Sequence, residues 1–124
     1  MGVARFLVHI HTGPADPNKV TLGAFIAAEA ARQGHAVTLF FAGDAVDSLS
    51  PVHRDRMEGL GTGRLAEHLV ALGAAGGTVC ISRLSAVARD HDEGLLNGLG
   101  APARFATPDM LVALAAEADT VLCY

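Results

Sequence analysis

The chain has 124 residues, and its 51% hydrophobic content is enough to bury one core without disulfides or a structural metal. A net charge of -4, with 9 Lys plus Arg, gives no basic surface of the kind that nucleic acids or anionic lipids require, so neither is an expected partner. The apolar stretches are far shorter than the roughly 18 residues that span a bilayer, and no secretory signal is visible. A cytoplasmic location without membrane contact is therefore expected.

The first third of the chain predicts two strands joined by a helix. Residues 4–11 are apolar and partly β-branched, which is typical of a strand buried on both faces of a parallel sheet. Turn residues follow as far as Asn18, and helical periodicity then runs over 20–33. Residues 35–41 form the second expected strand, and a short helical turn follows it.

The middle of the chain predicts a long connection and a third strand. Residues 51–63 are charged, rich in glycine and aperiodic, so they are interpreted as an exposed loop. Helical periodicity returns over 64–74 and leads into a strand at 78–81. A short helix is expected over 84–89.

The last part predicts one more helix between two strands. Residues 103–106 indicate a brief fourth strand. Thr107 as the N-cap and Pro108 at the first helical position open a helix that runs to about Ala118. Residues 120–124 supply the fifth strand.

This alternation of strands and helices predicts an α/β fold, in which residues 1–124 form a single three-layer domain, flavodoxin-like in size, around a mostly parallel five-stranded sheet. Ligands of such sheets bind beyond the carboxyl ends of the strands, near the place where the strand order reverses. That rule selects four segments as the functional rim, namely 11–18, 43–44, 80–85 and 106–108.

The two cysteines, Cys80 and Cys123, are expected to be free thiols rather than a disulfide. Cys80 is predicted to close the third strand before a helix, where the helix terminus and Arg83 would stabilise a partly exposed thiolate. The alternative is that Cys80 is a small buried hydrophobe. Cys123 lies inside the last strand and is assigned a structural role.

His9 and His11 project to the same face of one strand, a spacing that metal sites use, and Asp44 at the neighbouring strand end could supply a third ligand. No metal is expected: His9 is interpreted as a packed, hydrogen-bonded residue and His11 as a polar or proton-exchanging group on the rim. No cofactor is expected either, because the glycine run 59–63 does not leave the first strand as a dinucleotide loop should. The candidate binding residues on the rim are His11, Thr12, Asn18, Asp44, Ser82 and Arg83.

Four segments carry a resemblance to a known family: FLVHIHTGPADPNK, VTLFFAGDAV, TVCISRLSAVAR and TPDMLVALAAEADTVLCY. In their order and spacing they resemble the DsrE/DsrF-like family, small α/β proteins related to sulfur-relay subunits. In relay members, a cysteine at the end of the third strand receives a persulfide sulfur and passes it on, and Cys80 occupies the matching place. The resemblance also implies self-assembly into a trimer or hexamer.

Two functions follow as hypotheses. The first is a sulfur-handling protein, a persulfide carrier or sulfurtransferase-like protein that works through Cys80 with a sulfur donor or acceptor protein as partner. The alternative is a non-catalytic oligomeric module that binds a small ligand or a partner protein at the rim.

Overall fold

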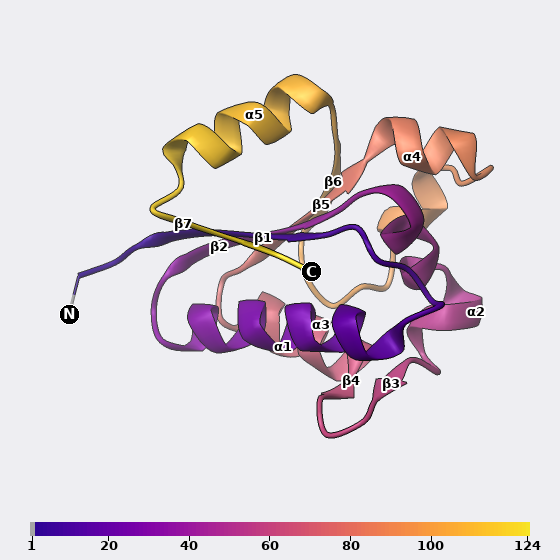
Figure 1. The fold of residues 1–124 in the computed structure, drawn as a ribbon, viewed down its shortest axis with the longest axis horizontal. Coiled ribbons are helices and arrows are strands. Elements are labelled where there is room, and N and C mark those ends of the chain that lie inside the picture. The colour runs from indigo at the N-terminus through magenta and orange to yellow at the C-terminus, as the bar shows by residue number, and fades with distance from the viewer. Residues whose placement is uncertain (1) are drawn as a thin grey trace.

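The computed structural model describes residues 2–124, which form a five-stranded sheet in the order β6-β5-β2-β1-β7. Every neighbouring pair of strands is parallel, and helices cover both faces (Figure 1). This confirms the expected fold class. The strands are β1 (Arg5–Ile10), β2 (Ala36–Phe41), β5 (Thr78–Ser82), β6 (Ala103–Ala106) and β7 (Thr120–Cys123).

The helices form two layers that differ in size (Figure 1). On one face lie α1 (Pro17–Arg32) and α3 (Leu65–Ala74); α5 (Pro108–Glu117) lies across the other face, and α4 (Arg83–Ala88) lies near the carboxyl ends of the strands. None of the helices within residues 2–124 is long and apolar enough to cross a membrane. The short elements are η1 (Gly43–Leu49), α2 (Pro51–Arg54), β3 (Glu58–Gly59), β4 (Gly63–Arg64) and η2 (Glu93–Leu96).

The side chains of the sheet divide between two cores of unequal size, because successive residues of a strand face opposite sides. The larger core lies under α1 and α3, and six of the eight buried residues of α1 belong to it. The smaller core consists of Leu7, Phe40, Cys80 and Ala106, which pack against partly buried side chains of α5 and the residue after it. No residue of α5 itself is buried. The layer over the smaller core is therefore the thinner of the two.

Two boundaries differ from the prediction for local reasons. Helix α1 begins at Pro17 rather than at residue 20, because the Asp16 side chain accepts a hydrogen bond from the Lys19 N–H at 3.3 Å and Pro17 occupies the first helical position. The loop predicted over 51–63 is wrong in part, since it contains α2 and the antiparallel pair of β3 and β4. Strands of two residues are too short to leave a periodic signal in the sequence.

The remaining elements lie close to their predicted positions. Strands cover 78–82 and 103–106, and the Pro108 that was expected to open the last helix does so. Thr107 is the N-cap of that helix, but its hydroxyl donates to Asp109 instead of accepting from the helix backbone. Helix α5 thus begins without a side-chain cap.

At Gly73, helix α3 lies very close to the backbone of the segment that leads into β6. A Cβ added at Gly73 would lie 2.1 Å from the carbonyl oxygen of Gly100 and 2.8 Å from the Cα of Ala101. Gly73→Ala should therefore lower the free energy of unfolding by about 1–3 kcal/mol in urea titrations, although alanine is the better helix former by about 1 kcal/mol.

Gly23→Ala in α1 is the matched control. Its added Cβ would meet the end of the Ile10 side chain at 2.8 Å, and a flexible side chain can move where a backbone cannot. We expect a smaller loss of stability than for Gly73→Ala. A Gly73→Ala chain as stable as the wild type would contradict the close backbone approach.

Candidate functional site

Three of the loops selected for the rim lie in contact at the carboxyl end of the sheet. A Cβ added at Gly13 would lie 2.4 Å from the carbonyl oxygen of Asp44, so the loops after β1 and β2 touch through their backbones. The Gly43 N–H donates to Ser85 Oγ at 2.9 Å, which joins the loop after β2 to α4. The sheet therefore brings these segments together from distant parts of the sequence.

Three of the predicted binding residues on this rim make hydrogen bonds or ion pairs within the fold. The Asp44 carboxylate pairs with Arg89 at 2.8 Å. Asn18 Oδ1 accepts from the Leu60 N–H at 2.8 Å, and the Ser82 hydroxyl accepts from the Ser85 N–H at 3.2 Å as the N-cap of α4. These side chains therefore hold the loops of the rim in place.

The other three predicted binding residues remain nearer to the surface. His11 is exposed just beyond β1, and Thr12 beside it is half-buried. Arg83 is exposed at the start of α4, and its guanidinium lies 5.3 Å from the ring centroid of Phe105. An arginine over an aromatic face gains a cation–π attraction, which directs the Arg83 charge toward β6.

A network of charges that the sequence analysis missed joins η1 to the end of α4. Arg89 pairs with Asp44 and reaches Asp47 at 4.0 Å, and His91 Nε2 lies 2.7 Å from the other Asp47 oxygen. The partners come from segments more than 40 residues apart. No local spacing could have indicated this network, which fixes α4 against the loop after β2.

Cys80 lies inside β5 and is 1% exposed, so the expectation of a partly exposed thiol at the strand end is wrong for this conformation. The strand continues to Ser82 before α4 begins. Phe40 and Leu7 adjoin Cys80 in the small core, and Met110, Leu111, Leu114 and Ala118 pack on them from α5 and the residue after it. The apolar face of α5 was visible in the sequence, but its placement over β5 was not.

Cys80 belongs to a row of side chains that crosses the sheet on the face covered by α5. The register pairs Cys123 with His9, His9 with Phe40, and Phe40 with Cys80. In-register neighbours of a parallel sheet project to the same face. Three strand spacings, about 14 Å, separate the two cysteines. Both are free thiols, as predicted.

His9 occupies the second place in this row, and its imidazole is only partly supplied with partners. The ring lies 5.6 Å from that of Phe40 and 5.4 Å from that of His11. Packing was predicted, but the expected hydrogen bond is missing at Nε2, which is buried and has no partner. Burial lowers the pKa of His9, and the neighbouring His11 lowers it further, so the ring is neutral at neutral pH.

Cys123, for which the sequence predicts a structural role, is exposed. The alternation along β7 explains this: a Cβ at Gly23 would meet the Tyr124 ring at 3.1 Å, so Tyr124 packs on the side of α1 and Cys123 faces the opposite side. The same alternation was present in the sequence. The sequence alone could not predict that β7 lies at the edge of the sheet.

Comparison with known proteins identifies the family. The DsrE/DsrF-like family model matches residues 4–124. The chain belongs to this family. The crystal structure of the ychN protein from E. coli is similar, with a TM-score of 0.72 and 20% sequence identity over 100% of both chains, a likeness that shows the fold. No curated protein sequence matches the chain significantly.

In this DsrE/DsrF-like chain, no cluster of three or more His, Cys, Asp or Glu residues within positions 2–124 is arranged to hold a metal ion. His9 and His11 do lie together, but Asp44 is paired with Arg89. Family membership supports a role related to sulfur relay, and the thiols Cys80 and Cys123 are the groups that could carry it.

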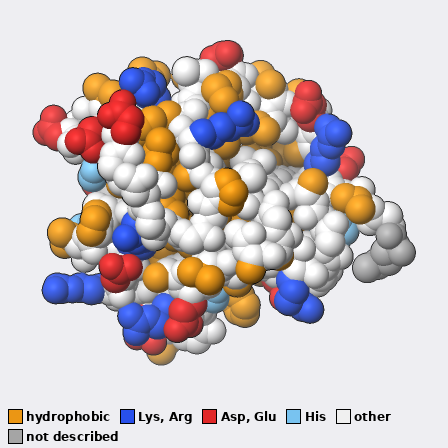
Figure 2. Space-filling model, turned by 180° about the vertical axis from the view of Figure 1, so that it is seen from behind, with side chains coloured by type: hydrophobic (Ala, Val, Ile, Leu, Met, Phe, Trp, Pro, Cys, Tyr) orange, Lys and Arg blue, Asp and Glu red, His pale blue; other side chains and the backbone are white. Residues whose placement is uncertain are grey.

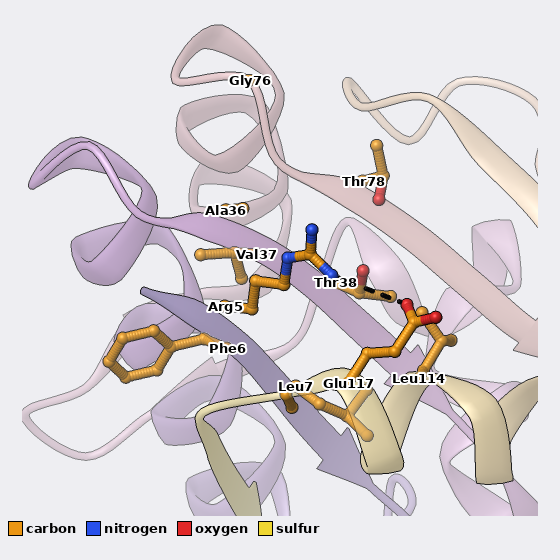
Figure 3. Close-up of a pocket in the computed structure, with 11 residues that line it drawn as sticks. Arg5, Phe6, Leu7, Ala36, Val37, Thr38, Gly76, Thr78, Leu114 and Glu117 are labelled. Carbon is orange, nitrogen blue, oxygen red and sulfur yellow. Dashed lines mark ion pairs between the residues drawn. The ribbon is translucent and has the colours of Figure 1, made fainter. Parts of the chain in front are cut away.

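The structure also has a hollow away from the carboxyl ends of the strands, where ligand binding was expected. It has a volume of about 430 Å³ and lies at the amino ends of the strands, on the face covered by α5 (Figure 3). Arg5 points across it toward Glu117, with 3.7 Å between their charged atoms. Thr38 and Thr78 line it from the sheet. The hollow is thus polar on one side, and the positively charged Arg5 side chain that lines it is already paired with Glu117.

The lowered pKa of His9 predicts a stability that depends on pH. The folded chain binds a proton at His9 more weakly than the unfolded chain, whose His9 has an ordinary value of 6.5. The contribution of His9 to the free energy of unfolding is therefore fully present above that pH and is lost as the pH falls from there through the lower pKa of the folded chain. Wild type should lose more stability between about pH 7.5 and about pH 5.5 than His9→Phe does, in urea titrations.

His53→Phe in α2 is the control for this prediction, because His53 lies outside the row. It should lose as much stability over the same interval as the wild type. Equal losses in the wild type and His9→Phe would show that His9 is as easily protonated in the folded chain as in the unfolded one.

Proposed function

We propose that this DsrE/DsrF-like protein carries sulfane sulfur as a persulfide on Cys80. Membership in the family supports a sulfur-related role, and Cys80 is a free thiol in the third strand of the main sheet. The observation that carries the proposal is the position of this thiol beneath α5, a helix with no fully buried residue of its own. A carrier needs a thiol that is shielded while loaded and reachable when sulfur is exchanged.

Helix α5 has the properties of a cover that can open locally. It has ten residues and no side-chain cap at its amino end, and a helix of that length is marginal without tertiary packing. Its packing comes from partly buried side chains over a core of four residues. Helix α1 on the other face has eight buried residues. Segments with few buried apolar contacts open at a lower free energy than the global unfolding of the domain.

The transfer itself needs only thiol chemistry. With α5 lifted, the Cys80 thiolate attacks the outer sulfur of a donor persulfide, R–S–SH; the S–S bond of the donor breaks, and the donor leaves as a thiolate that takes up a proton. Cys80 then holds the outer sulfur as Cys80–S–SH. An acceptor thiolate attacks that sulfur in the same way and restores the Cys80 thiol. No oxidant, metal or cofactor is consumed in either step.

The apolar surroundings of Cys80 suit this role between the two steps. A persulfide is easily lost to water-borne thiols, and the side chains of Phe40, Leu7 and α5 exclude solvent from the Cys80 position. Closing a site over a reactive intermediate prevents such side reactions. Free cysteines also suit a reducing compartment, which agrees with a cytoplasmic protein.

The test is sulfur loading measured by intact mass spectrometry in a chain whose only cysteine is Cys80. Incubation of Cys123→Ser with a low-molecular-weight persulfide should add one sulfur atom per chain. The double variant Cys80→Ser/Cys123→Ser should add none and should keep its fold by circular dichroism. A folded Cys123→Ser chain that takes up no sulfur would contradict the proposal.

We also propose that the chain self-associates, with a trimer or hexamer as the family resemblance implies. Exposed apolar side chains support this: Figure 2 shows them at the surface between charged groups. Leu22, Phe25 and Val70 lie on α1 and α3, and the Phe25 ring stacks on His68 at 4.7 Å beside an apolar groove. Val112 and Val121 are exposed on α5 and β7. The same groove would serve the second candidate function, a non-catalytic module that binds a ligand or partner.

Sedimentation velocity tests self-association directly. The wild type should sediment as a discrete oligomer at micromolar concentration, and Phe25→Asp should weaken it by placing a charge on the apolar surface of α1. Lys19→Asp is the control, because Lys19 is an exposed residue near the amino end of the same helix. A wild-type chain that sediments only as a monomer would contradict the proposal.

A further inference from the structure

The hollow at the amino ends of the strands has the size of a small-molecule site. Its volume of about 430 Å³ lies within the range of roughly 300–1,000 Å³ that such sites occupy. The sheet forms its floor, where the register pairs Leu7 with Thr38 and Thr38 with Thr78. Leu7 belongs to the small core under α5, so the two threonines in register with it face α5 as well. The last turn of α5 and the residue after it supply Leu114, Glu117 and Ala118.

Four polar side chains of this hollow have hydrogen-bonding capacity that the fold does not use. The charged atoms of Arg5 and Glu117 are 3.7 Å apart, which is too long for a hydrogen bond, and the two side chains are 65% and 68% exposed. Within residues 2–124, the hydroxyls of Thr38 and Thr78 make no hydrogen bond either. Arg5 points across the hollow toward Glu117, so these groups converge on one space (Figure 3).

The backbone, rather than the ion pair, holds Arg5 in its place beside the end of α5. The Arg5 N–H donates to Asp119 Oδ2 at 2.7 Å, and the Asp119 N–H donates to the Arg5 carbonyl oxygen at 2.9 Å. Asp119 follows Glu117 by two residues, so the cation of β1 and the anion of α5 are fixed near each other. An exposed ion pair contributes only about 0–1 kcal/mol. A ligand can therefore separate the two charges at little cost.

The charges of the hollow favour a ligand that carries both signs. A simple anion would meet Glu117, and a simple cation would meet Arg5, whereas a zwitterion satisfies both. The carboxyl end of α5 adds negative partial charge beside Glu117, which also favours an ammonium group there. A carboxylate can accept from the guanidinium of Arg5 and from the threonine hydroxyls. Leu7, Leu114 and Ala118 supply apolar contacts for the rest of the ligand.

We propose that this hollow binds a free α-amino acid with an apolar side chain. The carboxylate of the ligand pairs with Arg5, and its ammonium group donates to Glu117. The apolar side chain of the ligand packs on Leu7 and Leu114. Because the lining comes from both the sheet and α5, the site is complete only while α5 lies on the sheet. It takes no part in the sulfur chemistry proposed for Cys80, and its test measures binding alone.

The test is a titration of the ¹⁵N-labelled wild-type chain with L-leucine, followed by the backbone amide shifts of Thr38, Thr78 and Glu117. These shifts should change saturably. Two analogues each lack one charge: 4-methylpentanoate has no ammonium group, and 3-methylbutylamine has no carboxylate. Each should bind at least about tenfold more weakly than leucine, because a charged hydrogen-bonding group of the site is left without its partner. No saturable change with leucine, or a smaller difference for either analogue, would overturn the proposal.

Variants of the two charged residues locate the binding. Arg5→Gln and Glu117→Gln should each bind leucine at least about tenfold more weakly than the wild type, and a smaller loss in either would overturn the site. Both side chains are exposed, so neither change opens a cavity, and the amide spectrum establishes that each variant is folded. Arg32→Gln is the matched control, because Arg32 pairs with Glu29 on α1, over the other face of the sheet. A tenfold loss in Arg32→Gln would place the binding elsewhere and contradict the proposal.

Discussion

The contact that separates the two thiols of this structure is the packing of α5 on the sheet. Four side chains of the sheet, Leu7, Phe40, Cys80 and Ala106, form a separate small core only because α5 covers them. That single contact decides which of the two thiols is shielded. Without it, the side chain of Cys80 would be open to solvent on this face of the sheet. The large core under α1 and α3 supports the other face of the sheet, while the small core under α5 excludes solvent from Cys80.

Much of the fold could be predicted because its signals are local. Continuous apolar runs indicate β1 and β2, and the Thr107 and Pro108 pair marks the start of α5 within the sequence itself. The parallel sheet follows from the alternation of such elements. The missed features have no local signal: β3 and β4 have two residues each, and the start of α1 depends on a cap formed by Asp16 within a turn.

The site was harder to predict because it depends on pairings between distant segments. The burial of Cys80 results from a helix that begins near residue 108, and the proximity of Cys123 and His9 results from the pairing of the last strand with the first. The same is true of Arg89, which binds Asp44 from another loop. Local chemistry indicates only that a thiol could be reactive. It assigned exposure to the wrong cysteine, because exposure is a property of the assembled layers.

The most direct test of this account is the rate at which an alkylating reagent labels Cys80 in Cys123→Ser as urea is raised below the unfolding transition. If α5 is a local cover, labelling should proceed through an opening whose free energy is lower, and whose dependence on urea is weaker, than those of global unfolding. Leu114→Ala, which thins the contact of α5 with the small core, should accelerate the labelling more than it accelerates global unfolding. Labelling of Cys80 that occurs only through global unfolding, with the same free energy and the same urea dependence, would contradict the role assigned to α5.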